Sequence, residues 1–261
     1  IMPDINNGVE KILTTKYMGR PFIYMNTTES TQNEVTRYAL GGADEGLAVG
    51  AGYQSQGRGR LDREWLSTEG SSILVSILLK PEKRYVNHIV VMAALGLESF
   101  IKQIDPNIPV SIKWPNDILI EGKKVAGILV ERTPAHQTGM QDIVVLGMGV
   151  NMNLDTSKIP EIASISTSLY NFTGKTFDLV NGYATLFKNL EAHYELLKNG
   201  TDLFSEWKNK LITLGRTVKI TDGQEEIVGL AKDVDETGSL IVQRKDGTKF
   251  NVIAGDAHLL N

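Results

Sequence analysis

The sequence contains no cysteine among its 261 residues. Disulfide bonds, thiolate nucleophiles and zinc–thiolate sites are therefore excluded, and a reducing cytoplasm is the expected location. The only histidines are four scattered residues whose spacing fits no metal site, namely His88, His136, His193 and His258. No apolar run is long enough to span a bilayer, and no stretch has the basic start and apolar centre of a signal peptide.

The sequence also lacks an excess of basic residues. It has 27 Lys and Arg against 31 Asp and Glu, a net charge of −4. A general nucleic-acid binder needs a basic face that displaces counterions from phosphates, so we expect no nucleic-acid partner. Hydrophobic residues make up 41% of the chain, enough for one large domain, or for a medium domain with a small appendix.

Apolar periodicity predicts strands alternating with helices up to about residue 212. The expected strands are 22–26, 46–54, 72–80, 110–120, 124–132 and 142–153, and the expected helices are 30–42, 85–104, 177–200 and 201–212. Residues 121–124 (EGKK) predict a tight hairpin, which places Lys124 at the start of its second strand and favours antiparallel pairing.

The pattern changes near residue 213, where short strands are separated by Asp-Gly and Thr-Gly turns. Such turns are typical of a small β barrel. The expected fold class is therefore α+β, with a mixed, mostly antiparallel sheet packed with helices and a small β module. The expected domains are an N-terminal extension (1–21), a larger domain (22–212) and a C-terminal domain (213–261).

Three arginines, Arg58, Arg60 and Arg63, lie in the glycine-rich stretch 51–65, AGYQSQGRGRLDREW. Glycines allow the backbone to approach a ligand closely, and guanidinium groups bind phosphate or carboxylate in bidentate fashion. The spacing is that of neither a P-loop nor G-x-G-x-x-G. The stretch therefore predicts an anion-binding loop, with a solvated basic turn as the alternative.

Two further stretches carry polar residues into buried strands. Residues 113–117 (KWPND) crowd a lysine, an amide and a carboxylate where unpaired charges are costly. The alternative is a proline-bent strand end with capping side chains. Residues 124–131 (KVAGILVE), taken alone, favour an exposed hairpin lysine followed by a core strand.

Taken together, YQSQGRGRLDREW, KWPNDI, KKVAGILVE and GMGVNMN resemble, in this order, the catalytic domain of the biotin protein ligases, or biotin–[acetyl-CoA-carboxylase] ligases. Residues 29–34 (ESTQNE) resemble that family's ST-N entry to its first helix. The resemblance covers residues 22–212, and the tail matches the family's small C-terminal domain. Leu61 and Asp62 depart from the pattern, because the family often has basic residues there.

The resemblance implies a class II synthetase-like fold with an SH3-like C-terminal barrel. It also implies a reaction in which biotin and ATP form biotinyl-5′-AMP, and biotin then passes to a lysine of a biotin carboxyl carrier domain. Mg²⁺ is expected to bind through the substrate phosphates, without assigned protein ligands. A homodimer is possible, and no membrane partner is expected. Residues 1–21 are too few for the winged helix of regulatory members, so a monofunctional form is expected.

The resemblance further implies roles for particular residues. Lys124 bridges the biotin carboxylate and the α-phosphate, Arg58 and Arg60 cover the adenylate, and Asp117 orients the acceptor amine. Trp65 stacks on adenine, Asn151 hydrogen-bonds it, and the glycines leave room for the biotin ring. The expected biotin-binding residues are Ser30, Thr31, Gln54, Gly57, Arg58, Arg60, Lys124, Gly127, Ile128, Gly147 and Gly149. The expected ATP-binding residues are Arg58, Arg60, Trp65, Asn116, Lys124 and Asn151.

Other functions stay open at this stage. Lipoate ligases and lipoyl or octanoyl transferases share the fold class and also couple a carboxylate to a lysine. A biotin-sensing transcriptional regulator needs a DNA-binding helix pair, which residues 1–21 cannot supply. A catalytically inactive binding module is disfavoured by the presence of Lys124, Arg58 and Arg60.

Overall fold

The structure, a computed structural model, describes residues 4–61, 63–133, 142–222, 225–253 and 255–260. Asp62 and His136 lie outside these ranges. Within them, no helix combines the length and the apolar character needed to cross a bilayer.

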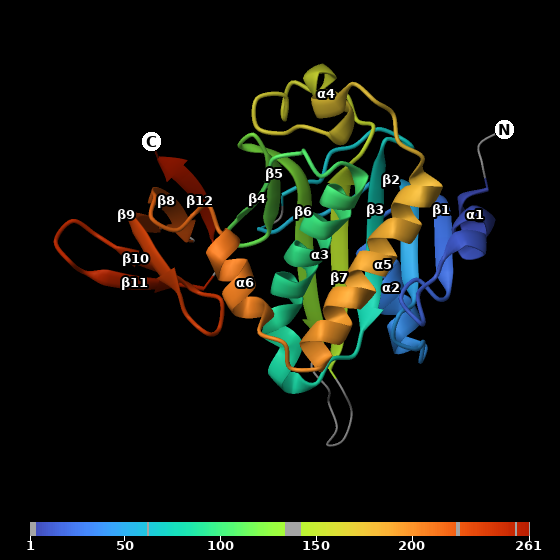
Figure 1. The fold of residues 1–261 in the computed structure, drawn as a ribbon, viewed down its shortest axis with the longest axis horizontal. Helices are drawn as coiled ribbons and strands as arrows, with labels where there is room; N and C mark the ends of the chain where they lie inside the picture. The colour runs from blue at the N-terminus through green and yellow to red at the C-terminus, as the bar shows by residue number, and fades with distance from the viewer. Residues whose placement is uncertain (1–3, 62, 134–141, 223–224, 254, 261) are drawn as a thin grey trace.

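A seven-stranded mixed sheet forms the larger part of the molecule (Figure 1). Its order is β1-β2-β3-β7-β6-β5-β4; β1 and β2 are parallel, and the other neighbours are antiparallel. The strands are β1 (Phe22–Thr28), β2 (Ala48–Gln54), β3 (Ser72–Leu79), β4 (Val110–Lys113), β5 (Asp117–Ile120), β6 (Lys123–Thr133) and β7 (Ile143–Asn151). The predicted mixed, mostly antiparallel sheet is confirmed.

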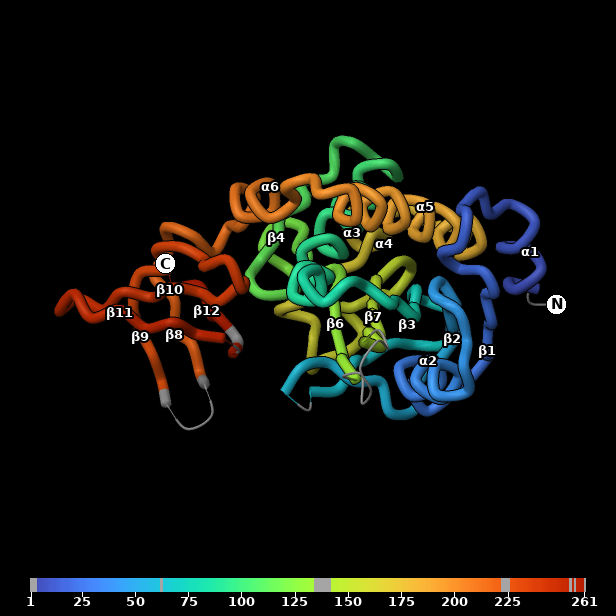
Figure 2. The backbone as a smooth tube through the Cα atoms, turned by 90° about the horizontal axis from the view of Figure 1, so that it is seen from below, coloured from blue at the N-terminus to red at the C-terminus, as the bar shows by residue number. Residues whose placement is uncertain are grey.

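Helices cover both faces of this sheet. Figure 2 shows α3, α5 and α6 on one side and α2 on the other. The helices are α1 (Ile5–Ile12), α2 (Thr31–Leu40), α3 (Ile89–Ile104), α4 (Leu169–Thr173), α5 (Leu179–Lys198) and α6 (Leu203–Lys210), with 3-10 turns η1 (Lys83–His88) and η2 (Thr156–Lys158). Helices α1 and α4 were not predicted, because they have only eight and five residues and so short a run is a weak helix signal.

The central strand β7 separates two apolar clusters. Leu146 and Val150 belong to the large core that includes residues of α3 and α5, whereas Val145 packs with Val35 and Ala39 of α2. Because side chains alternate along a strand, every second residue of β7 faces α2. That face carries two glycines in place of apolar side chains, so space is left above the sheet.

The observed starts of α2, α5 and α6 lie within two residues of the predicted ones, and the predicted hairpin is present. Asp178 caps α5 by accepting from the backbone N–H groups of Val180 and Asn181, and Asp202 caps α6. The 121–124 hairpin turns through Glu121 and Gly122, both with positive φ, as its two-residue loop requires.

Two predicted elements are wrong in detail. The single strand expected over 110–120 is two strands, β4 and β5, which pair with each other through Lys113 and Asp117. Pro115 lies in the turn between them and, without an N–H group, cannot donate a hydrogen bond to a neighbouring strand. The helix expected over 85–104 begins with the 3-10 turn η1 and becomes an α-helix only at Ile89.

A second sheet follows α6 and is antiparallel throughout, in the order β11-β10-β9-β8-β12. Its strands are β8 (Thr217–Asp222), β9 (Glu225–Val234), β10 (Leu240–Gln243), β11 (Lys249–Val252) and β12 (Asp256–Leu260). Val218, Ile220, Leu240 and Val242 are fully buried in it. This sheet agrees with the small C-terminal β module expected from the turns.

The segment before β1 is held by one carboxylate of α5. Glu191, 9% exposed, accepts hydrogen bonds from the backbone N–H groups of Lys16, Tyr17 and Met18 at 2.8, 3.0 and 3.0 Å. Removing the acceptor leaves partly buried N–H groups unsatisfied.

We predict that Glu191→Ala lowers the free energy of unfolding by about 1–3 kcal/mol, the cost of leaving buried polar groups unpaired. Urea denaturation at neutral pH measures this change. Glu10→Ala, at an exposed position of α1, is the control and is expected to change stability by less than about 0.5 kcal/mol. Equal stabilities of the two variants would show that the hydrogen bonds of Glu191 do not stabilise the segment before β1.

Candidate active site

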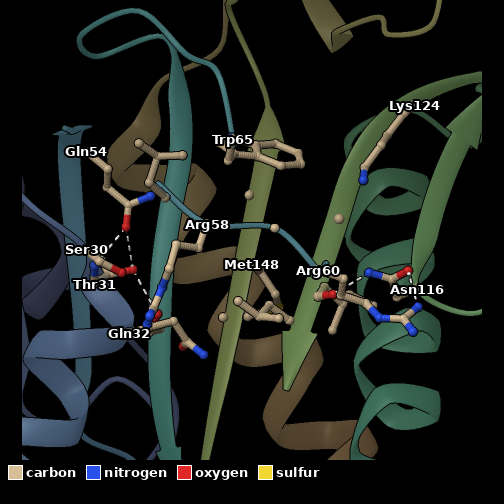
Figure 3. Close-up of a pocket in the computed structure, with 18 residues that line it drawn as sticks. Ser30, Thr31, Gln32, Gln54, Arg58, Arg60, Trp65, Asn116, Lys124 and Met148 are labelled. Carbon is tan, nitrogen blue, oxygen red and sulfur yellow. Dashed lines mark hydrogen bonds between the residues drawn. The ribbon is translucent and has the colours of Figure 1, made fainter. Parts of the chain in front are cut away.

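A cavity lies on the α2 side of the large sheet, at its centre (Figure 3). Figure 3 shows Ser30, Thr31 and Gln54 at one end and Arg60, Asn116 and Lys124 at the other, with Trp65 and Met148 between them. The full lining is Ser30, Thr31, Gln32, Gln54, Arg58, Gly59, Arg60, Trp65, Leu74, Ser76, Asn116, Lys124, Gly127, Ile128, Leu129, Gly147, Met148 and Gly149. The cavity therefore joins a neutral polar end to a cationic end.

The neutral end is a connected hydrogen-bond network at the start of α2. Gln54 Oε1 accepts from the backbone N–H and the hydroxyl of Thr31, at 2.7 and 3.0 Å. The Thr31 hydroxyl also lies 2.8 Å from the hydroxyl of Ser76, which is fully buried on β3. Ser30 occupies the N-cap position, but its side chain makes no capping bond. These groups are held in fixed positions facing the cavity.

Two buried amide oxygens lack a hydrogen-bond partner among the described residues, Gln32 Oε1 and Asn151 Oδ1. Both side chains are almost fully buried, 4% and 3% exposed. A Cβ atom on Gly147 would lie 2.8 Å from Gln32 Oε1, so the Gln32 amide packs directly against this glycine. Buried polar atoms are nearly always paired, and each of these two acceptors therefore suits an N–H group of a bound molecule.

Trp65 lies across the floor of the cavity above two glycines that pair between β6 and β7, Gly127 and Gly149. A Cβ atom would come within 2.9 Å of the indole at Gly127 and within 2.3 Å at Gly149. The Trp65 backbone N–H donates to the Gly57 carbonyl at 2.9 Å, which holds the end of the arginine loop. The glycines, expected to leave open room, instead accommodate Trp65 and Gln32 here.

Lys124 and Asp117 form an ion pair at the cationic end, with 2.6 Å between Lys124 Nζ and Asp117 Oδ1. The pairing of β5 with β6 shifts register between Ile118 and Leu119, a bulge beside Lys124. The bulge interrupts the alternation of side chains and directs Lys124 along the strand, where Nζ lies 3.0 Å from a Cβ position on Gly127. Nζ also lies 5.4 Å from the Trp65 ring centroid, within cation–π range.

The arginine loop is fastened to the sheet by amides. Arg60 donates to Asn116 Oδ1 at 3.2 Å, and Asn116 donates to the Ile128 carbonyl of β6 at 2.6 Å. Arg58 donates to Asn33 Oδ1 at 2.8 Å and lies 3.5 Å from Glu131 Oε1. Two guanidinium groups therefore border the same cavity as Lys124. These three cations give the cavity the positive charge needed to bind an anion.

All the predicted site residues line this cavity except Gly57, Asp117 and Asn151. Gly57 lies behind Trp65, Asp117 holds Lys124, and Asn151 lies two residues beyond Gly149 on the same face of β7. Six further residues line the cavity that were not among the predicted site residues: Gln32, Gly59, Leu74, Ser76, Leu129 and Met148. Ser76 had a signal, because it is a polar residue within the apolar strand SILVSILL.

A protein-bound metal centre does not fit the described part of the chain. No group of three or more His, Asp or Glu side chains there could hold a metal ion. The expected Mg²⁺ therefore stays a prediction, with the phosphates of a nucleotide as its ligands.

Comparison with known proteins gives consistent matches. The biotin/lipoate A/B protein ligase family matches residues 24–151, and the biotin protein ligase C-terminal domain matches residues 213–260. The bifunctional ligase/repressor BirA of Bacillus spizizenii is 31% identical over 242 residues, covering 91% of this chain and 74% of that protein. The biotin–[acetyl-CoA-carboxylase] ligase of Mycobacterium tuberculosis is 31% identical, with 88% and 85% covered.

Solved structures agree with these matches. The biotin protein ligase of Aquifex aeolicus in complex with biotin and ATP superposes with a TM-score of 0.76 at 28% identity, covering 94% of this chain and 99% of that one. With a sequence relative that is 31% identical and covered over 74% of its length, the chain belongs to the biotin/lipoate A/B protein ligase family and, within it, to the biotin protein ligases.

Proposed function

We propose that this cavity carries out both steps of biotin ligation, the ATP-dependent formation of biotinyl-5′-AMP and the transfer of biotin to a lysine of a carrier domain. The observation that supports it most is that Lys124 and Arg60 lie at one end of a cavity whose other end is a neutral hydrogen-bonding network, with Arg58 also on its lining (Figure 3). Biotin has the same polarity, with a neutral ureido ring at one end and a carboxylate at the other.

The unpaired acceptors fit the two substrates. Gln32 Oε1 suits a ureido N–H of biotin, next to the Thr31 and Gln54 network. Asn151 Oδ1 suits the exocyclic amine of adenine, because its own N–H donates to the Thr167 carbonyl at 3.0 Å and fixes the orientation of the amide. Trp65 offers an aromatic face for stacking between these two ends.

Lys124 is placed to reduce the repulsion between two anionic substrates. A carboxylate oxygen of biotin attacks the α-phosphorus of ATP, the bond to the bridging oxygen breaks, and pyrophosphate leaves. An ammonium between carboxylate and phosphate stabilises the charge that develops there, a contribution often worth several kcal/mol. Arg58 and Arg60 cover the phosphate side, and together these cations hold the anionic adenylate away from water.

Asp117 serves the second step in this proposal. The amine of the acceptor lysine attacks the acyl carbon of the adenylate, and AMP departs with the phosphate. The amine must lose a proton, and the Asp117 carboxylate, which contacts Lys124, is our candidate for orienting the amine and accepting that proton. Relatives that are biotin–[acetyl-CoA-carboxylase] ligases point to a biotin carrier domain of acetyl-CoA carboxylase as the acceptor.

Other expectations remain predictions. They are the domain boundaries at residues 21 and 212, a homodimer, the absence of a nucleic-acid partner, and a cytoplasmic location. Mg²⁺ would supply charge neutralisation of the pyrophosphate when bound with ATP.

We predict that the chain catalyses exchange of labelled pyrophosphate into ATP with biotin, and at least about tenfold more slowly with lipoate or octanoate. The fixed polar end provides hydrogen-bonding groups for a ureido ring, and a substrate without that ring leaves them unpaired. Side-by-side exchange assays with the three acids measure the preference. Exchange driven by lipoate and not by biotin would refute the proposal.

We further predict that Lys124→Ala abolishes most biotin-dependent exchange but keeps measurable biotin binding, because the ammonium matters most when the two anions meet. Lys124→Arg is also impaired, since a planar guanidinium does not replace a compact ammonium between two anions. Calorimetry and exchange on the same preparation measure both quantities. The control is Lys123→Ala at the neighbouring exposed position, and wild-type exchange in Lys124→Ala would remove Lys124 from the mechanism.

A further inference from the structure

Trp114 joins the active-site motif to the C-terminal domain. It lies between β4 and β5, is 1% exposed, and donates its indole N–H to the Gly238 carbonyl at 2.8 Å. Its backbone N–H donates to the hydroxyl of Thr213, which is fully buried, at 2.9 Å. Both acceptors belong to the region matched by the C-terminal domain, residues 213–260. Figures 1 and 2 show β4 as the edge of the large sheet next to this domain.

The C-terminal side of this contact is a turn held by the Asp235 carboxylate. The Asp235 carboxylate accepts from the backbone N–H and hydroxyl of Thr237 and from the backbone N–H of Ser239, and these bonds hold the pKa of Asp235 below its usual value. Gly238 has a φ of +86°, a conformation that favours glycine. The turn therefore presents the Gly238 carbonyl to Trp114 from a fixed position.

The other side of the contact leads directly to the cationic end of the cavity. Asn116, two residues after Trp114, holds Arg60 and the Ile128 carbonyl. Asp117, the next residue, pairs with Lys124 at 2.6 Å. Pro115 restricts the backbone between them, so little freedom is left to absorb a displacement of Trp114. A shift of the indole is transmitted to the residues that hold Arg60 and Lys124.

We propose that Trp114 is a positioning residue through which the C-terminal domain sets the geometry of adenylate formation. The inference rests on the proposed function. Contacts between domains in one chain generally permit relative motion, and a directional bond at the junction restricts it. The Thr31 and Gln54 network, which is proposed to hold the ureido ring, lies on α2 and β2, outside this chain of contacts. We therefore expect biotin binding to depend less on Trp114 than adenylate formation does.

The test is Trp114→Phe, which keeps an aromatic ring and removes the N–H donor. We expect the kcat of biotin-dependent pyrophosphate exchange to fall about tenfold or more, because the Gly238 carbonyl loses its partner and Trp114 is no longer fixed to the turn. The biotin Kd is expected to stay within about twofold of wild type. A merely structural role would lower the midpoint of thermal unfolding and leave kcat unchanged at temperatures where the protein is folded.

The chain offers a matched control in Trp207→Phe. Trp207 is also 1% exposed, but its indole N–H has no acceptor among the described residues. Removing this N–H group therefore breaks no hydrogen bond within the described structure. This variant is expected to keep the wild-type kcat within about twofold.

A second pair of variants covers the case in which Trp114→Phe does not fold. Thr213→Val removes the acceptor of the Trp114 backbone N–H and is expected to lower kcat, whereas Thr213→Ser keeps the hydroxyl and the rate. The inference is overturned if Trp114→Phe and Thr213→Val both fold and exchange at the wild-type rate. It is also overturned if Trp114→Phe does not fold and Thr213→Val folds and exchanges at the wild-type rate. Absence of biotin-dependent exchange in the wild type would instead refute the proposed function.

Discussion

The ion pair between Lys124 and Asp117 is the constraint on which the site depends. It depends on the bulge in β6 beside Lys124, which directs the lysine side chain along the strand toward Gly127. The lysine backbone is also bonded to the loop that follows β7, through the Ile165 carbonyl and the Thr167 N–H. A partly buried ammonium needs a counter-charge, and Asp117 supplies one without closing the site, because the Lys124 side chain keeps 32% of its surface exposed.

One face of the large sheet packs into the apolar core, and the other face lines the cavity. On the α3 and α5 side, β7 contributes apolar side chains to a continuous core, and on the α2 side it contributes Gly147, Gly149 and Asn151. Lack of side chains on two of these positions makes room for Gln32 and Trp65, each of which has a buried polar atom without a partner in the described structure. These unpaired polar atoms lie beside the cavity, where a bound ligand could form hydrogen bonds with them.

Features encoded locally were predictable from the sequence. The caps Asp178 and Asp202 and the Glu121–Gly122 turn depend on residues within a few positions of one another. The glycine–arginine loop and the strand glycines were likewise assigned to one site from their motifs, and they line one cavity. The roles of Gln32 and Ser76 were not predictable, because they arise only when α2 and β3 pack together. The bond from Trp114 to Gly238 spans 124 residues and has no local signal.

The most direct test of this account is a crystal structure of the chain with a nonhydrolysable analogue of biotinyl-5′-AMP. The account predicts that Lys124 Nζ lies about 3 Å from both an acyl oxygen and a phosphate oxygen of the analogue, and that Gln32 Oε1 accepts from a ureido N–H. An analogue bound elsewhere, or one that leaves Lys124 in contact with Asp117 alone, would contradict it.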